Sequence, residues 1–150
     1  MSLVVLLDSA PLGELVNPRL SVTATEWAER IVRAGGHILV PAIVYYELRR
    51  ELVRIASTRS VSRLDALAER FEIIDVSVAV LKRASDLWAR ARTLGLPTAP
   101  DRALDVDVIL AASAEIVALD RPGDDVVVAT SNVGHLARFV SASPWHEIHP

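Results

Sequence analysis

Acidic residues occupy three places in the sequence where a carboxylate would face a ligand. Asp8 directly follows the apolar run 3–7, Glu47 lies in the apolar part of a helical segment, and Asp105 and Asp107 precede another apolar segment. Burying a carboxylate is costly unless a cation or a hydrogen-bond donor accompanies it. Carboxylates that converge on one cleft therefore predict a hard divalent cation, Mg²⁺ or Mn²⁺. Such an ion is suited to phosphodiester hydrolysis, because it activates water and stabilises charge on the phosphate.

Each of these acids also has a structural explanation. Asp8 could cap a helix or form a turn, and Asp105 could cap the helix that it opens. Glu47 could lie on a solvated helix face beside an arginine. Asp107 lies two residues further into its helix than Asp105, where capping explains it less well.

A fourth group of polar side chains follows the apolar run 126–129. Thr130, Ser131 and Asn132 carry hydroxyl and amide groups that can bind a phosphate oxygen or a water molecule. They could equally form the cap of a following helix, a role that suits Asn132.

Short apolar runs alternate with longer amphipathic segments along the chain, a pattern typical of a parallel sheet covered by helices, the α/β class. Strands are predicted at 3–7, 37–40, 71–76 and 126–129, with a terminal edge strand at 147–149. Helices are predicted at 21–34, 42–57, 60–70, 77–94, 105–119 and 132–140. Ligands of open parallel sheets bind beyond the carboxyl ends of the strands, where Asp8 and Thr130 would lie.

Composition limits the classes of protein that remain. The 150 residues suit one domain spanning 1–150, and 51% hydrophobic with 23% charged residues excludes a disordered chain. The absence of cysteine excludes disulfides, thiolate nucleophiles and cysteine-containing zinc sites, and four histidines give a nitrogen-rich zinc site little support. We therefore expect a cytoplasmic protein.

Charge and hydropathy give two further exclusions. The net charge of −3 argues against nucleic-acid binding by bulk positive charge alone. The first apolar run, 3–7, is far shorter than the ~20 residues of a membrane span, so we expect no membrane partner.

Four motifs in this order resemble the PIN domain family over nearly the whole chain. They are Leu6-Leu7-Asp8-Ser9, Pro41-Ala42-Ile43-Val44-Tyr45-Tyr46-Glu47-Leu48, Asp107-Val108-Ile109-Leu110-Ala111-Ala112-Ser113-Ala114 and Val128-Ala129-Thr130-Ser131-Asn132. The resemblance implies a three-layer α/β/α sandwich around a central parallel sheet of four to five strands. It also implies a metal-dependent ribonuclease, of the kind found among VapC-type toxins that a partner antitoxin neutralises.

The resemblance assigns roles residue by residue. The family's first, second and third acids correspond to Asp8, Glu47 and Asp107, and its polar motif after the last strand corresponds to Thr130 and Asn132. Two departures stand out.

Many members have Thr-Asn after the first acid, where this chain has Ser9-Ala10. Many also carry a fourth acid after Asn132, where this chain has His135. These departures leave open whether one or two ions bind, and Asp105 could compensate for the missing acid.

The leading hypothesis is an endoribonuclease that cuts single-stranded RNA. Asp8, Glu47 and Asp107 would hold the metal and Asp105 would assist. Thr130 or Asn132 would orient water or phosphate. The proposed RNA contacts are Ser9, Arg50 and Arg102, and a solvated helix face is the alternative explanation for Arg50.

Two other functions compete with this hypothesis. A catalytically weakened PIN-like domain that binds RNA or protein would explain the missing fourth acid. A haloacid-dehalogenase-like phosphatase ranks last, because its Asp-x-Asp motif fails at Ala10. An apolar patch of Tyr45, Leu87, Trp88 and Leu94 is expected to support a homodimer or receive an antitoxin.

Overall fold

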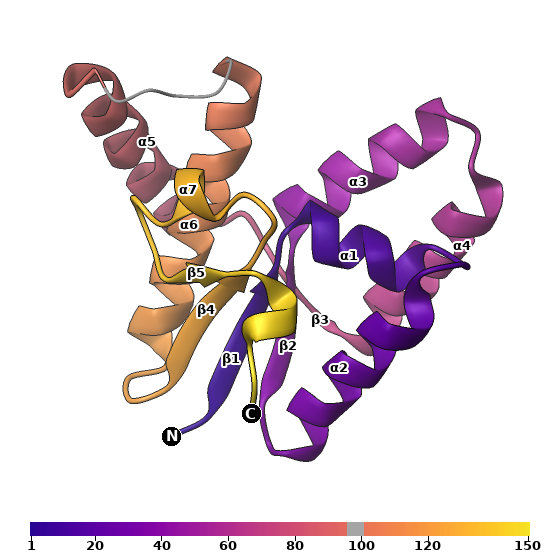
Figure 1. Ribbon diagram of the computed structural model, residues 1–150. Helices are drawn as coiled ribbons and strands as arrows, with labels where there is room; N and C mark the ends of the chain where they lie inside the picture. Colours follow the sequence, from indigo (N-terminus) through magenta and orange to yellow (C-terminus); the bar gives the residue numbers. More distant parts are fainter. Residues whose placement is uncertain (96–100) are drawn as a thin grey trace.

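The computed structural model describes residues 1–95 and 101–150, and side chains for 1–95 and 104–150 (Figure 1). Its core is a five-stranded sheet with the order β3-β2-β1-β4-β5, in which all neighbouring strands are parallel. The strands are β1 (Leu3–Leu7), β2 (His37–Pro41), β3 (Glu72–Ile74), β4 (Asp125–Ala129) and β5 (Ala142–Ser143). The predicted parallel sheet of four to five strands is confirmed.

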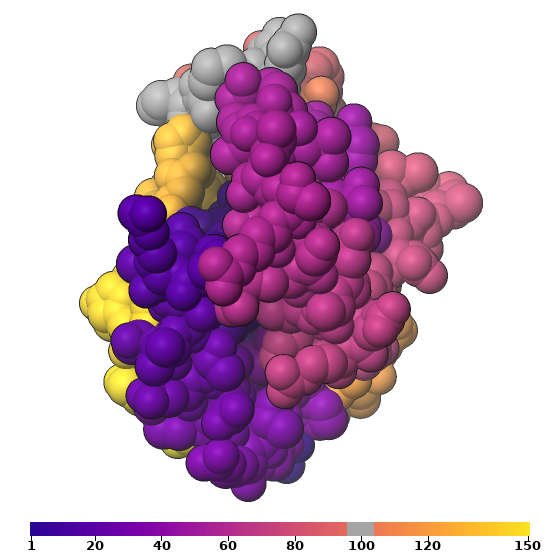
Figure 2. Space-filling model, turned by 90° about the vertical axis from the view of Figure 1, so that its right-hand side faces the viewer, coloured from indigo at the N-terminus to yellow at the C-terminus, as the bar shows by residue number. Residues whose placement is uncertain are grey.

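Helices cover both faces of this sheet, so the three-layer architecture is confirmed as well. They are α1 (Ser9–Val16), α2 (Ser21–Arg33), α3 (Ala42–Arg54), α4 (Thr58–Arg70), α5 (Val78–Thr93), α6 (Asp101–Asp120) and α7 (Val133–Leu136), followed by the 3₁₀ helix η1 (Trp145–Glu147). Helices α1 and α2 lie on one side, and α5 and α6 on the other (Figure 1). Seen from the right, α1 to α4 form most of the surface (Figure 2). Within the described part of the chain, no helix is long and apolar enough to cross a membrane.

The central strand has no polar alternation because both of its faces are covered. Val4, Val5, Leu6 and Leu7 are fully buried, as a strand between two helical layers requires. On the α6 side, Ala114 packs with the sheet while Ala111 and Ala112 pack in a second cluster with α5. Small side chains let these layers approach closely, and this fixes where α6 passes the end of the sheet.

One helix is absent from the sequence-based prediction. Helix α1 begins directly after Asp8 and contains Pro11 and Gly13, residues that usually mark turns. Proline is tolerated there because it lies in the first helical turn, where the backbone N–H has no intrahelical acceptor. Asp8 thus lies at a direct junction between a strand and a helix.

Three predicted elements are shorter in the structure, namely 71–76, 42–57 and 132–140, which become β3, α3 and α7. Two further predictions near the site or the C-terminus are wrong. Helix α6 begins at Asp101 rather than at Asp105, so Asp105 lies in its second turn and does not cap it. The edge strand is β5 rather than 147–149. Ile148 is instead buried beside Trp27, whose indole N–H donates to the Ile148 carbonyl at 2.9 Å.

Candidate active site

Asp8 is held rigidly at the carboxyl end of β1. Its backbone N–H donates to the Ala129 carbonyl at 2.9 Å, which ties it to the end of β4. Its Oδ1 accepts from the Ser9 N–H at 2.7 Å and its Oδ2 from the Thr130 hydroxyl at 2.7 Å. The side chain is only 9% exposed. The capping explanation of Asp8 is therefore confirmed, and the same side chain lies at the end of the sheet beside Thr130.

Thr130 forms hydrogen bonds both with Asp8 and with the loop after β4. It is 1% exposed, and its Oγ1 also accepts from the Asn132 N–H at 2.9 Å. The Thr130 hydroxyl donates its hydrogen bond to Asp8, so Thr130 positions that carboxylate. Asn132 lies at the N-cap position of α7, yet its exposed side chain makes no capping hydrogen bond. The expectation that the Asn132 side chain caps the helix is wrong.

Glu47 of α3 and Asp107 of α6 lie within electrostatic range of Asp8. Burial and the charge of Asp8 raise the pKa of Glu47, while hydrogen bonding to Ser9 and the charge of Arg50 oppose the rise. Burial, then the charges of Asp8 and Glu47, raise the pKa of Asp107 to about 6. The fold therefore brings together three carboxylates from β1, α3 and α6 that repel one another.

The donor set fits an open magnesium or manganese site. Among the described side chains, no three His, Asp or Glu residues stand close enough to form a preassembled metal cage. Mg²⁺ does not require one, because it retains several waters and binds one or two carboxylates together with substrate phosphates. Asp8 supplies a fixed carboxylate, and Glu47 and Asp107 supply half-buried ones whose repulsion a cation would relieve.

The remaining predicted residues lie at different distances from this centre. Ser9 lines a surface hollow together with Glu47 and Arg50. Asp105 is exposed, and a spacing of two residues turns it away from Asp107 around the helix. Arg102 belongs to the first turn of α6, and its side chain lies outside the described residues.

Tyr46 is a residue near the site that the sequence analysis did not single out. It shares a hollow between α3 and α6 with Arg50, and the guanidinium carbon of Arg50 lies 5.1 Å from the centroid of its ring. The signal in the sequence is the spacing of four between Tyr46 and Arg50, which places both on one helix face.

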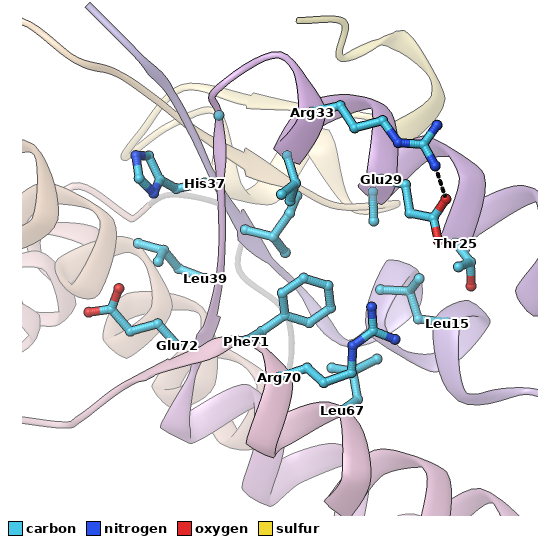
Figure 3. A pocket seen from close by; sticks show the side chains of 14 residues that line it. Leu15, Thr25, Glu29, Arg33, His37, Leu39, Leu67, Arg70, Phe71 and Glu72 are labelled. Carbon is cyan, nitrogen blue, oxygen red and sulfur yellow. Dashed lines mark hydrogen bonds and ion pairs between the residues drawn. The ribbon is translucent and has the colours of Figure 1, made fainter.

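A different hollow lies at the opposite end of the strands. Figure 3 shows it between α2, the start of β2 and the end of α4, with Phe71 and Leu67 on its apolar wall and the Glu29–Arg33 ion pair at its rim. Neither the three carboxylates nor Thr130 line it. It is therefore separate from the candidate active site.

Removing the Thr130 hydroxyl tests its positioning role. We expect Thr130→Val to lower the free energy of unfolding by about 1–3 kcal/mol, because Asp8 Oδ2 loses a buried donor and the Asn132 N–H its acceptor. Urea unfolding in EDTA measures this loss. Thr130→Ser keeps the hydroxyl and should recover most of the stability, whereas equal losses in both variants would assign the effect to packing.

Comparison with known proteins places this site in a family. The PIN domain model matches residues 5–132. Similar solved structures include VapBC2 from Rickettsia felis bound to a promoter DNA fragment, with a TM-score of 0.74 and 19% identity over 95% of this chain and 99% of that one. FitAcB from Neisseria gonorrhoeae gives a TM-score of 0.65 and 20% identity over 96% and 99% of the two chains. A toxin-antitoxin complex from Klebsiella pneumoniae gives 0.62 and 18% over 96% and 99%.

No curated protein sequence matches the chain. The structural similarities span almost the full length of both chains, and the family model includes all three carboxylates and Thr130. The chain belongs to the PIN domain family.

Proposed function

We propose that this protein is a Mg²⁺- or Mn²⁺-dependent endoribonuclease that hydrolyses phosphodiester bonds in single-stranded RNA. The observation that carries the proposal is the convergence of Asp8, Glu47 and Asp107 at the carboxyl end of β1, where burial and then the charge of Asp8 raise the pKa values of the last two. Membership of the PIN family supports it. An RNA substrate inside the cell would place the protein in the cytoplasm.

The residues divide into metal-holding, positioning and substrate-binding groups. Asp8, Glu47 and Asp107 would hold the ion, which when bound supplies activation of water and stabilisation of charge on the phosphate. Thr130 and the Ser9 N–H fix the orientation of Asp8. We assign phosphate or water orientation to the exposed Asn132 and an assisting charge to Asp105. RNA contact is proposed for Ser9, Arg50 and Arg102.

The test is cleavage of a mixed-sequence single-stranded RNA in Mn²⁺, Mg²⁺ or EDTA. We expect cutting with either ion, none in EDTA, and a loss of more than about 100-fold in Glu47→Gln, which keeps the shape of the side chain but removes its charge. Glu69→Gln, an exposed change on α4, is the matched control and should cut like the wild type. Cutting that persists in EDTA or in Glu47→Gln would contradict the proposed metal site.

An antitoxin partner is the second part of the proposal. The similar structures include VapBC2 bound to a promoter DNA fragment, FitAcB and a toxin-antitoxin complex. We infer that this protein is the toxin of such a pair. The inference predicts that a cognate partner suppresses RNA cleavage by the purified protein.

We also propose a homodimer, with a revised surface. Leu87 is 3% exposed and belongs to the α5–α6 core, and the Tyr45 hydroxyl is bound to Asp65, so neither forms the expected surface patch. Exposed apolar side chains do line α5, at Val78, Leu81 and Trp88. Sedimentation equilibrium at micromolar concentration tests this part of the proposal.

A weakened binding module remains the second candidate because α7 carries no carboxylate. The segment Val133–Leu136 places His135 where many PIN domains have an acid. Absence of both RNA cleavage and calorimetric Mn²⁺ binding would favour this alternative.

A further inference from the structure

Helix α3 carries two tyrosine–arginine pairs, and the fold uses only one of them internally. The Tyr45 hydroxyl donates to Asp65 at 2.7 Å, and Arg49 Nε donates to the same carboxylate at 2.9 Å. One position further along, Tyr46 and Arg50 form no hydrogen bond or ion pair with any described residue, and the guanidinium of Arg50 lies over the ring of Tyr46. The first pair joins α3 to α4, whereas the second faces away from the core.

The second pair lies in a groove that adjoins the hollow beside Glu47. Helix α3 begins at the carboxyl end of β2, and α6 runs down beside the sheet to the start of β4 (Figure 1). Between them lies a hollow of about 810 Å³, lined by Tyr46 and Arg50 of α3 and by Asp105 and Ile109 of α6. The hollow beside Ser9 and Glu47 shares Arg50 with it. The two hollows therefore adjoin at Arg50 and Glu51, and Glu47 lines the second of them.

The chemistry of this groove suits a nucleotide. Glu51 at its edge is neutralised by Arg54, whose Nε lies 2.9 Å from Glu51 Oε2. Arg50 makes no ion pair of its own among the described residues, although its charge acts at longer range on Glu47 and Glu51. Tyr46 is 57% exposed although Arg50 lies over its ring. A ring with accessible surface beside an unpaired guanidinium can stack a base and bind the adjoining phosphate.

We propose that Tyr46 and Arg50 form a nucleotide-binding subsite of the nuclease, in which a base of single-stranded RNA stacks on Tyr46 and Arg50 binds its phosphate. The inference rests on the proposed ribonuclease function and specifies how that site takes its substrate. Stacking on an aromatic ring needs a base that is not already paired and stacked in a duplex. It also tolerates any base, because every base has a π face. The subsite therefore selects single strands without selecting a sequence.

Binding of a fluorescein-labelled, mixed-sequence single-stranded RNA tests the subsite. The Asp107→Asn protein serves as parent so that the RNA stays intact, and fluorescence anisotropy is measured over a series of salt concentrations. In that parent, Tyr46→Leu should weaken binding about fivefold or more, whereas Tyr46→Phe, which keeps the ring, should bind like the parent. Arg50→Gln should weaken binding and reduce the slope against log salt by about one. Arg30→Gln, an equal charge change on the exposed face of α2, should alter affinity less than about twofold.

The outcomes separate this inference from the proposed function. If Tyr46→Leu and Arg50→Gln bind RNA like the parent, the subsite is wrong even if the wild type cleaves RNA. If Tyr46→Leu instead changes the sedimentation mass and leaves RNA affinity intact, the groove is a protein interface and the subsite is again wrong. If the variants lose affinity as expected but the wild type cuts no RNA with any metal, the subsite stands and the ribonuclease proposal falls.

Discussion

Replacing Asp107 with asparagine is expected to abolish RNA cleavage and to stabilise the metal-free fold. Activity should fall by more than about 100-fold, because a ligand of the divalent ion is lost. Stability should rise because the ionised Asp107 is half-buried and lies near the charges of Asp8 and Glu47. The asparagine keeps the shape of the side chain without that charge. A purely structural aspartate would behave in the opposite way, since its removal would destabilise the protein.

The stability gain has a defined dependence on pH. The pKa of Asp107 is raised in the folded protein to about 6 from an ordinary value of 3.8. A raised pKa favours the folded state below the ordinary value, and this contribution is lost as the pH rises through about 6. Relative to the wild type, Asp107→Asn should therefore gain about 1–2 kcal/mol at pH 8, after allowance for solvent screening, and almost nothing near pH 4.

Urea unfolding of both proteins in EDTA at the two pH values measures this difference. Asp105→Asn is the matched control, since it removes an exposed charge two residues away and should give no comparable gain. A stability gain that is the same at both pH values would exclude charge repulsion as its cause. Unfolding of Asp107→Asn at pH 8 would show that the carboxylate is structural.

The sheet and the placement of the site on it follow from patterns that sequence carries directly. Uninterrupted apolar runs such as 3–7 identify strands buried on both faces, and the carboxyl ends of parallel strands meet at one edge. This reasoning predicts that Asp8 and Thr130 lie close together, and the structure joins them by a 2.7 Å hydrogen bond.

What could not be predicted depends on contacts between distant residues. Helix α1 was missed because Pro11 and Gly13 are turn residues by local preference. Its packing overrides that preference, since Leu12, Leu15 and Val16 are buried in the main core. The true start of α6 at Asp101 was hidden for a similar reason, because Asp105 and Asp107 resemble the first turn of a helix in sequence.

The different contacts of the three arginines on α3 could not be predicted from the sequence either. Arg49, Arg50 and Arg54 are chemically identical and occur within six positions of one another. Only the fold shows that Arg49 is bound to Asp65 and Arg54 to Glu51. Arg50 differs from them because it makes no hydrogen bond or ion pair with any described residue. No local sequence pattern indicates such a difference.

Divalent ions are expected to stabilise the wild type strongly, because burial and the charge of Asp8, which together raise the pKa values of Glu47 and Asp107, cost less when a cation binds the carboxylates. At a concentration of Mn²⁺ about 100-fold above its dissociation constant, the gain is about 2.7 kcal/mol. For a chain of this size, that gain corresponds to a rise in Tm of about 5–10 °C. Thermal unfolding in MnCl₂, against NaCl of equal ionic strength, measures the rise. It should shrink markedly in Asp8→Asn and Asp107→Asn, whereas Asp105→Asn should keep most of it. An undiminished rise in all three variants would mean that the ion binds outside the carboxylate cluster, and the metal-holding role of Asp8, Glu47 and Asp107 would then be wrong.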